Sequence, residues 1–497
     1  MIRYWIQSDK IRGKIFIPKF YNPEIDATVS ALAATHDLRA VRELIDDGIL
    51  ATATGDEIGK NAYGTGDIPF VRTSDIANWE IKTAPKQGIS RDIYDEYATS
   101  QDVQESDILM VRDGTYLIGT NCFVTRVDKE LLYQSHLLKL RVTDKARLDP
   151  HILFLALNSP IAQRQIRSFQ FTADIIDTIG ARFFDTILPI PKSESVRASL
   201  VARTQSALTA RMLGKAFIKQ SPIIMEEVLR TGSSAPLEHF LSAGVDDIVD
   251  MLRQESVTSE FGEFEYFWLK SDEIRGSILI PKYYEPSIRR ELETLAPFCD
   301  LRSFAELRRD GLVEYGTGDE VGKMAYGTGK YPFLRTSDFA NWEIKHDPKQ
   351  GVSRAIYDEY APHQDVQEHD LLLVRDGTYL VGSSCIITEE DTNALYCGGL
   401  IKIRASRPDN LDPFLLLGLV NSYIVKRQIR TKQFTRDVID TIGNRLDEVV
   451  VPVPKSHSIR KSISDAVRTV VASRIAARRQ IVELAQEIEQ AAAVAAA

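Results

Sequence analysis

The chain alternates short apolar runs with longer stretches in which apolar residues recur every three or four positions. The short runs predict strands at Ile68–Val71, Ile108–Val111 and Ile187–Pro191, and a further strand is expected at 11–18. Gly-rich turns precede the first of these runs. The pattern indicates a sheet-rich module.

One turn and two helices complete this predicted module. The turn Asp113-Gly114-Thr115 is expected to open a partner strand over 116–124. A helix is predicted over 41–47. A second helix begins where Asp149 can cap the chain and Pro150 can occupy the first helical position, and its apolar spacing continues to about Phe169.

Every element of this pattern occurs again 263 positions later. The four tryptophans fall into two pairs, Trp5 with Trp268 and Trp79 with Trp342. The second copy has a helix predicted at Phe304–Arg309 and strands at 274–281, Tyr331–Leu334, 366–374 and Val450–Pro454. Because the period far exceeds the few tens of residues of a stacking repeat, each copy is expected to be a domain. A tandem pair gains most from a target that also has two halves.

Each copy ends in a long amphipathic helix. In the second copy apolar residues lie on one face from Ile459 to about Gln490, which gives a helix about 48 Å long. A helix of this length needs a partner. The expected partner spans 196–220, stops at Pro222 and resumes over 223–229, and further helix is predicted over 237–254.

Composition restricts the class of protein. The chain is 44% hydrophobic and 26% charged, as in ordinary globular proteins, and no apolar run approaches the roughly 18 residues that span a membrane. The start of the sequence lacks the features of a secretory signal, so we expect a cytoplasmic protein. The four cysteines show no metal-binding spacing, and no metal or cofactor is expected. A net charge of −9 leaves room for a local basic surface.

Catalytic motifs are weak. The string from Gly316 to Lys323 resembles a nucleotide loop but has Thr317 where a phosphate loop needs glycine, so we interpret it as a turn. The histidines are not duplicated, since His136 aligns with Gly399, and a duplicated active site should have duplicated its base. A self-contained nuclease that uses Asp113 and Asp376 stays open as an alternative, and so does a scaffold that binds proteins.

Polar residues suited to DNA are duplicated. Arginine can donate to guanine or phosphate, and glutamine can bind adenine. An ordinary solvated face explains each cluster taken alone, but their joint duplication favours contact surfaces. The expected DNA contacts in the first copy are Arg72, Thr73, Ser74, Lys86, Gln87, Arg91, Arg112, Thr115, Tyr116, Arg164, Arg167 and Gln170. Those in the second copy are Arg335, Thr336, Ser337, Lys349, Gln350, Arg354, Arg375, Thr378, Tyr379, Arg427, Arg430, Lys432 and Gln433.

The order of these motifs resembles a known family. The run from Ile68 through Asp75 to Ile76, then 107–119, then Ile187–Pro191 before a helix, is similar to a target-recognition domain of the specificity subunit of type I restriction–modification systems. Both copies carry every element. The family often has Glu-Gln after the Pro-x-Pro strand, where this chain has Lys192-Ser193-Glu194-Ser195 and Lys455-Ser456-His457-Ser458, and a related anti-phage defence system therefore stays open.

The resemblance implies an α+β fold with two target-recognition domains separated by long antiparallel, coiled-coil-like helices in a pseudo-two-fold arrangement. The expected domains are 1–192, a helical spacer over 193–260, a second recognition domain over 261–455, and a C-terminal helix over 456–497 that pairs with the spacer. It also implies a non-catalytic, sequence-specific DNA-binding subunit that reads a bipartite duplex and docks two methyltransferase subunits, together with a restriction or translocase subunit in some systems. Because the copies are so alike, the target is expected to approach an interrupted palindrome.

Overall fold

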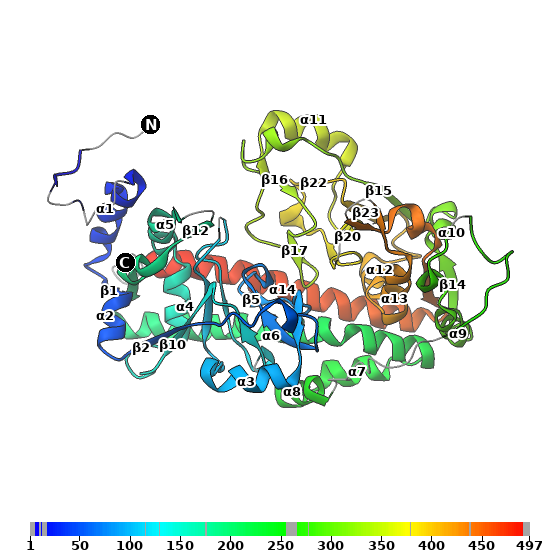
Figure 1. The fold of residues 1–497 in the computed structure, drawn as a ribbon, viewed down its shortest axis with the longest axis horizontal. Helices are drawn as coiled ribbons and strands as arrows, with labels where there is room; N and C mark the ends of the chain where they lie inside the picture. The colour runs from blue at the N-terminus through cyan, green and yellow to red at the C-terminus, as the bar shows by residue number, and fades with distance from the viewer. Residues whose placement is uncertain are drawn as a thin grey trace. The chain divides into compact units, whose positions relative to one another are not determined.

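The computed structural model describes residues 5–8, 11, 17–114, 116–128, 130–173, 176–254, 266–276, 278–377, 379–436 and 439–490. The chain forms two compact units (Figure 1). Unit 1 comprises Met1–Met212 and Arg474–Ala497, and unit 2 comprises Leu213–Ser473. Each unit therefore contains one copy of the repeated module and one half of each of two long helices.

Unit 1 is built from short strands, which are β1 His36–Ala40, β2 Leu50–Thr54, β3 Ile68–Val71, β4 Ile76–Ala77, β5 Glu80–Ile81, β6 Gln87–Ile89, β7 Ile108–Val111, β8 Asn121–Phe123, β9 Leu132–Tyr133, β10 Leu137–Val142, β11 Phe171–Ala173, β12 Ile176–Thr178 and β13 Ile187–Pro191. One sheet has the order β2-β10-β7-β8 and is antiparallel throughout. A second has the order β6-β3-β9, in which β3 and β9 are parallel. The pairs β1-β13, β4-β5 and β11-β12 complete the unit.

The helices of unit 1 are α1 Pro23–Leu32, α2 Val41–Asp46, α3 Arg91–Gln101, α4 Pro150–Asn158, α5 Pro160–Phe169 and the first half of α6 Glu194–Thr231. The predicted start of α4 is confirmed, since the Asp149 side chain accepts the amide of His151 and Pro150 is the first helical residue. The predicted stretch to Phe169 is two helices rather than one. Ser159 breaks it because it leaves the helical region and caps α5 through the amide of Ala162.

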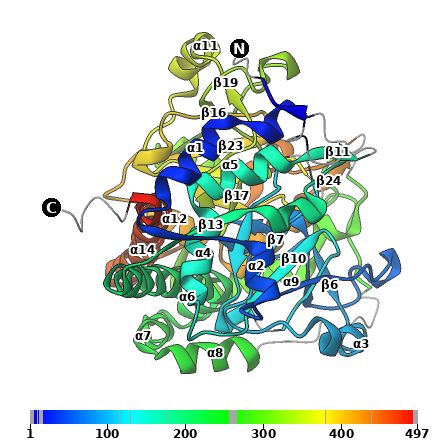
Figure 2. The same ribbon diagram turned by 90° about the vertical axis from the view of Figure 1, so that its left-hand side faces the viewer.

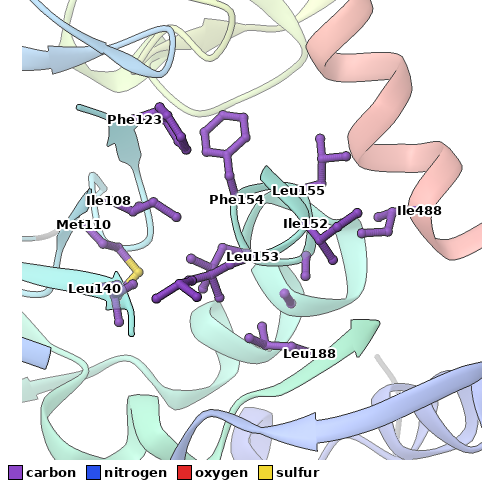
Figure 3. Packing of buried hydrophobic residues seen from close by; sticks show 14 of the residues in the cluster. Ile108, Met110, Phe123, Leu140, Ile152, Leu153, Phe154, Leu155, Leu188 and Ile488 are labelled. Carbon is purple, nitrogen blue, oxygen red and sulfur yellow. The ribbon is translucent and has the colours of Figure 1, made fainter. Parts of the chain in front are cut away.

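The core of unit 1 lies between the larger sheet and the helices. Leu153 and Phe154 of α4 pack among Ile108 and Met110 of β7, with Ile488 of the last helix in the same cluster (Figure 3). Figure 2 shows α4 beside β13, which it contacts. These side chains are almost fully buried. The core thus joins the sheet to the long helices.

A tight hairpin between β4 and β5 places two buried side chains, those of Trp79 and Glu80, against this core and the long helices. Asn78 and Trp79 form its turn, and both have positive φ, 50° and 63°. A left-handed pair of this kind matches the right-handed twist of the strands, although it is uncommon for tryptophan. The turn places the Trp79 ring in the core, where its Nε1 donates to Asn158 Oδ1 at 2.9 Å. The next residue, Glu80, is buried beside the long helices.

Unit 2 repeats the strands as β14 Cys299–Ser303, β15 Val313–Thr317, β16 Tyr331–Leu334, β17 Phe339–Ala340, β18 Glu343–Ile344, β19 Gly351–Val352, β20 Leu371–Val374, β21 Ser384–Ile386, β22 Leu395–Tyr396, β23 Leu400–Ala405, β24 Phe434–Arg436, β25 Ile439–Thr441 and β26 Val450–Pro454. Its helices are α7 Ala235–Ser242, α8 Val245–Gln254, α9 Pro286–Leu295, α10 Phe304–Arg309, α11 Arg354–Gln364, α12 Pro413–Val420, α13 Tyr423–Lys432 and half of α14 His457–Gln490. The sheets have the equivalent orders, β15-β23-β20-β21 and β19-β16-β22. The α+β fold class is confirmed.

The long helices pack against each other within each unit and run antiparallel there. In unit 1, Leu200 and Leu208 of α6 share the core with Ile481 and Leu484 of α14. In unit 2, Met225 of α6 lies with residues of α14 around Gly418. Figure 1 shows α14 in red beside α6 in green. The partner expected for the C-terminal helix is confirmed.

The predicted stop at Pro222 is wrong, because α6 continues through it. Proline at this position removes the amide that would donate to the carbonyl of Ile218, four residues earlier. The hydroxyl of Ser221, which is fully buried, donates to that carbonyl instead, at 2.9 Å. The freed acceptor is therefore satisfied, and the helix can proceed.

Three other expectations need correction. Over 274–281 the described residues form turns and no strand, and residue 279 is a leucine exposed at the surface. Residues 12–16 of the matching stretch 11–18 lie outside the described residues. The partner strand expected over 116–124 is shorter, Asn121–Phe123, because turns occupy 116–119 and Gly119 has φ of 88°. The helix expected over 237–254 is divided into α7 and α8.

Candidate nucleic-acid interface

Parallel pairing of β3 with β9 brings two loops to one sheet edge in unit 1. Val71 pairs with Tyr133, so the residues that follow, Arg72 and Gln134, leave the sheet side by side. Antiparallel pairing of β7 with β10 places Leu137 opposite Val111 and brings the loop that begins at Arg112 to the same place. Three loops that are distant in the sequence therefore converge.

A buried carboxylate fixes the first of these loops. The Asp75 side chain accepts the amide of Arg72 at 3.0 Å and the amide of Lys86 at 3.2 Å. Burial raises the pKa of Asp75, while the nearby Lys82 opposes the shift. In unit 2 the Asp338 carboxylate accepts the amide of Arg335 at 2.9 Å, and burial raises its pKa as well. The Arg-Thr-Ser-Asp motif is thus a rigid turn that anchors its own first residue.

The second loop is organised around Asp113. Its Oδ2 lies 3.1 Å from His136 Nδ1 and 3.4 Å from Arg112 Nε, and its Oδ1 accepts the hydroxyl of Thr178 at 2.5 Å. The amide of Gly114 donates to the carbonyl of Asp177, which joins the loop to the β11–β12 hairpin. His136 keeps 38% of its side chain exposed, whereas Asp113 keeps 13%. The Asp113 carboxylate therefore holds this loop together, and the partly exposed His136 ring lies against it.

The third loop, residues 134–136, connects the other two, and we call it the junction loop. Gln134 Oε1 accepts from Arg72 Nε at 3.3 Å, and the Ser135 hydroxyl donates to Glu57. The amide of Arg112 donates to the carbonyl of His136 at 3.0 Å. The Arg72 guanidinium also lies 5.9 Å from the ring centre of Tyr63, within cation–π range.

Unit 2 has the same backbone at this place but different side chains. Its junction loop is Cys397-Gly398-Gly399. The carbonyl of Gly398 accepts from Arg375 Nη1 at 3.2 Å, and Asp376 has Arg375 at 3.5 Å. Arg335 lies 5.7 Å from the ring centre of Tyr326, and among the described residues its guanidinium makes no hydrogen bond.

Two of the four arginines expected on the helices after Asp149 and Asp412 hold the turns that follow Asp113 and Asp376. Arg167 Nη1 donates to the carbonyl of Tyr116 at 2.9 Å, and Arg430 Nη2 donates to the carbonyl of Tyr379 at 3.0 Å. Arg164 is exposed and donates to Thr28, while Arg427 forms ion pairs with Glu285 and Glu291. The Arg427 side chain is therefore already paired with two carboxylates of unit 2.

The remaining expected contacts divide into enclosed and exposed groups. Gln170 and Gln433 donate to Asp177 and Asp440 of the hairpins, and Lys432 pairs with Glu448 at 3.2 Å. The exposed members are Lys86, Arg91, Arg335, Lys349 and Arg354. Thr73, Ser74, Gln87, Thr336, Ser337 and Gln350 are half-buried on the same loops. Thr115 and Thr378 lie outside the described residues.

The sequence interpretation missed Gln134, Ser135 and Glu57. A signal was present, because the two copies differ at the junction loop while the motifs on either side repeat. The Asp113 carboxylate bonds to Thr178 and lies beside His136, whereas the Asp376 carboxylate lies 3.5 Å from Arg375 Nε. All four cysteines are buried free thiols.

Comparison with solved structures finds chains to which this one is similar. It matches type I S subunits over 92% of its length. The S subunit of a type I restriction–modification system from M. genitalium is 12% identical, with 94% of that chain covered and a TM-score of 0.34. The HsdS subunit from Thermoanaerobacter tengcongensis is 15% identical, with 94% covered and a TM-score of 0.25.

A third match is a structure concerned with complex assembly and conformational transition of the type I R-M system, 15% identical, with 97% of that chain covered and a TM-score of 0.26. No protein-family model and no curated protein matches the chain. Within the part of the chain that the structure describes, no helix is both long and apolar enough to cross a membrane.

Proposed function

We propose that the chain is a non-catalytic specificity subunit that reads a bipartite duplex DNA target and directs partner methyltransferase subunits to it. The observation that carries this proposal is the convergence of three loops, from strands of two sheets, at one place in each unit, which we call the junction. Each junction places an arginine, Arg72 or Arg335, on a rigid turn above a tyrosine ring. Two such surfaces in one chain suit a target with two halves.

Rigid loops support recognition of bases. Arg72, Arg112 and Gln134 are held by backbone hydrogen bonds before any ligand arrives, so little conformational entropy is lost on binding. The exposed cations on neighbouring loops, such as Lys86 and Lys349, suit a phosphate backbone. Base contacts would then come from the junctions, and phosphate contacts from the loops around them.

The proposed partners follow from the motif resemblance rather than from a site on the surface. We propose two methyltransferase subunits and, in a restricting system, a translocase subunit. The proposed division of the chain is recognition domains at 1–192 and 261–455, a spacer over 193–260 and a C-terminal helix over 456–497. A related defence system would keep the DNA-reading role and change the partner.

Selection from a pool of random duplexes tests the function. The purified chain, with and without its methyltransferase, should enrich a split sequence whose halves approach an interrupted palindrome. Enrichment of nothing in both preparations would overturn the proposal. Incubation of the chain with DNA and Mg²⁺ tests the nuclease alternative, and a protein scaffold would bind no duplex while still capturing its subunits.

A further inference from the structure

The two junction loops share one backbone frame. In unit 1 the amide of Gln134 donates to Val71 at 3.0 Å, that of Leu137 to Gln134 at 2.9 Å, and that of Arg112 to His136 at 3.0 Å. The equivalent bonds in unit 2 are Cys397 to Leu334 at 2.9 Å, Leu400 to Cys397 at 3.0 Å, and Arg375 to Gly399 at 2.9 Å. The loops therefore differ in side chains and not in path.

The side chains at these positions determine which hydrogen-bond donors each unit can offer to a ligand. In unit 1, Gln134 engages the Nε of Arg72, and His136 covers Asp113. Because Arg72 Nε already donates to Gln134, that atom is not available to donate to a base. The Nδ1 of His136 faces the carboxylate, which directs Nε2 away from Asp113.

In unit 2 the corresponding positions carry no side chain able to engage the arginine. Cys397 is buried, and Gly399 has no side chain, since a Cβ there would lie only 3.1 Å from Thr336 Cγ2 and would crowd it. Arg335 is exposed, and in the described part of unit 2 its guanidinium makes no hydrogen bond. A free guanidinium beside a tyrosine face suits the two acceptors, O6 and N7, on the major-groove edge of guanine.

We propose that the junction loops make the two half-sites unequal, so that unit 2 requires a guanine read by Arg335 at a position where unit 1 does not. This inference rests on the proposed function and refines it. The target is then an interrupted palindrome whose two halves differ at one base. That difference arises because unit 1 has Gln134 and His136 where unit 2 has Cys397 and Gly399.

The test exchanges the loops in the full-length chain. The variant Q134C/S135G/H136G places the unit 2 loop in unit 1, and C397Q/G398S/G399H does the reverse. Because the shared frame uses only backbone atoms, unit 1 should fold with the shorter side chains. Random-duplex selection with wild type should give halves that agree except at the proposed guanine. The first exchange should bring that guanine into half-site 1 with a preference of about tenfold, and leave half-site 2 unchanged.

Four further variants separate the outcomes. His136→Ala should shift half-site 1, whereas His239→Ala, which removes an exposed histidine of α7, should not. Arg335→Lys keeps the charge but loses the planar fork, so it should lower guanine preference about tenfold with little change in salt dependence. A phosphate role for Arg335 would instead leave the preference intact in Arg335→Lys and reduce the salt dependence in Arg335→Ala.

The results distinguish the two proposals. A wild-type chain that selects no sequence defeats the proposed function. A wild-type chain that selects two identical halves, or folded exchange variants with unchanged base profiles, defeats this inference alone. If the first exchange lowers the melting temperature and prevents the assay, His136→Ala and Arg335→Lys decide the matter, because the reverse exchange would crowd Thr336.

Discussion

Arg211 and Arg474 each donate a hydrogen bond to the other's backbone carbonyl. Arg211 Nη1 lies 3.3 Å from the oxygen of Arg474, and Arg474 Nη1 lies 3.2 Å from the oxygen of Arg211. The two residues occupy equivalent positions of the repeat, one on α6 and one on α14, and both are buried. Glu80, carried by the β4–β5 hairpin, lies between them, 3.1 Å from Arg211 Nη2 and 2.5 Å from Arg474 Nη2. One carboxylate thus joins the repeated module of unit 1 to both long helices.

Replacing Glu80 should destabilise unit 1 strongly. Glu80→Gln removes the carboxylate charge that lies against two buried guanidinium groups, and breaking a buried pair of this kind costs about 3–5 kcal/mol. Urea unfolding of the variant should show a lower midpoint. Glu487→Gln is the matched control, because its pair with Arg203 is 42% and 39% exposed and should contribute about 1 kcal/mol or less. Equal effects of the two substitutions would contradict this role for Glu80.

The Ser221 hydroxyl should matter only because Pro222 follows it. Ser221→Ala leaves the buried carbonyl of Ile218 without a donor, which should cost about 1–3 kcal/mol. In a Pro222→Ala background the restored amide can donate to the same carbonyl, so Ser221→Ala should cost less there. A double-mutant cycle from urea unfolding measures this coupling. Additive effects would show that the hydroxyl does not substitute for the missing amide.

Acid should weaken the link between α3 and the larger sheet of unit 1. The Arg141 guanidinium bonds to Asp102 at 2.6 Å and lowers the pKa of that carboxyl below its ordinary value near 3.8. A depressed pKa contributes stability that is present above the unfolded-state value and is lost as pH falls through the folded-state value. Arg141→Gln should therefore reduce the urea midpoint at pH 6, and the gap from wild type should narrow towards pH 3. A gap independent of pH would argue against the ion pair.

Exposed loop cations and enclosed helix cations should behave differently in DNA binding. Lys86→Ala combined with Lys349→Ala should flatten the dependence of log K on log salt by roughly 0.9 for each phosphate that the variant no longer neutralises. Arg427→Ala removes ion pairs with Glu285 and Glu291, so it should lower the unfolding midpoint instead. Fluorescence anisotropy across a salt series gives the slopes. An unchanged slope in the double lysine variant would remove both residues from the interface.

The set Arg164, Arg167, Arg427 and Arg430 is a harder case. Alanine at all four should weaken binding and flatten the salt dependence if these side chains touch DNA. Arg167 and Arg430 also brace the turns at Tyr116 and Tyr379, so the melting temperature must be recorded beside the slope. Weaker binding with an unchanged slope would assign them to bracing alone.

Much of the fold follows from local pattern. The strands at Ile68–Val71 and Ile187–Pro191 and the helix cap at Asp149 were predictable because each depends on neighbouring residues. The continuation of α6 through Pro222 was not, since it depends on how the Ser221 hydroxyl is oriented in the helix. The short β8 reflects the turns before it, whose backbone the apolar pattern does not reveal.

The candidate site was only partly predictable. Arg72 and Arg112 were expected from their motifs, but nothing local shows that Gln134 lies beside Arg72. That proximity results from parallel pairing between β3 and β9, which lie about 60 residues apart in the chain. The partners of Arg427, two glutamates from α9 and its cap, are likewise set by tertiary packing.

Main-chain hydrogen bonds set the path of the junction loop, and this has an evolutionary consequence. Because no side chain at 134–136 takes part in the three bonds that set its path, point mutations there can change which base is preferred without a large loss of stability. A lineage carrying such a duplicated gene could alter one half of its target while preserving the other. New specificities could then arise by drift in a few codons, ahead of any wholesale recombination between modules.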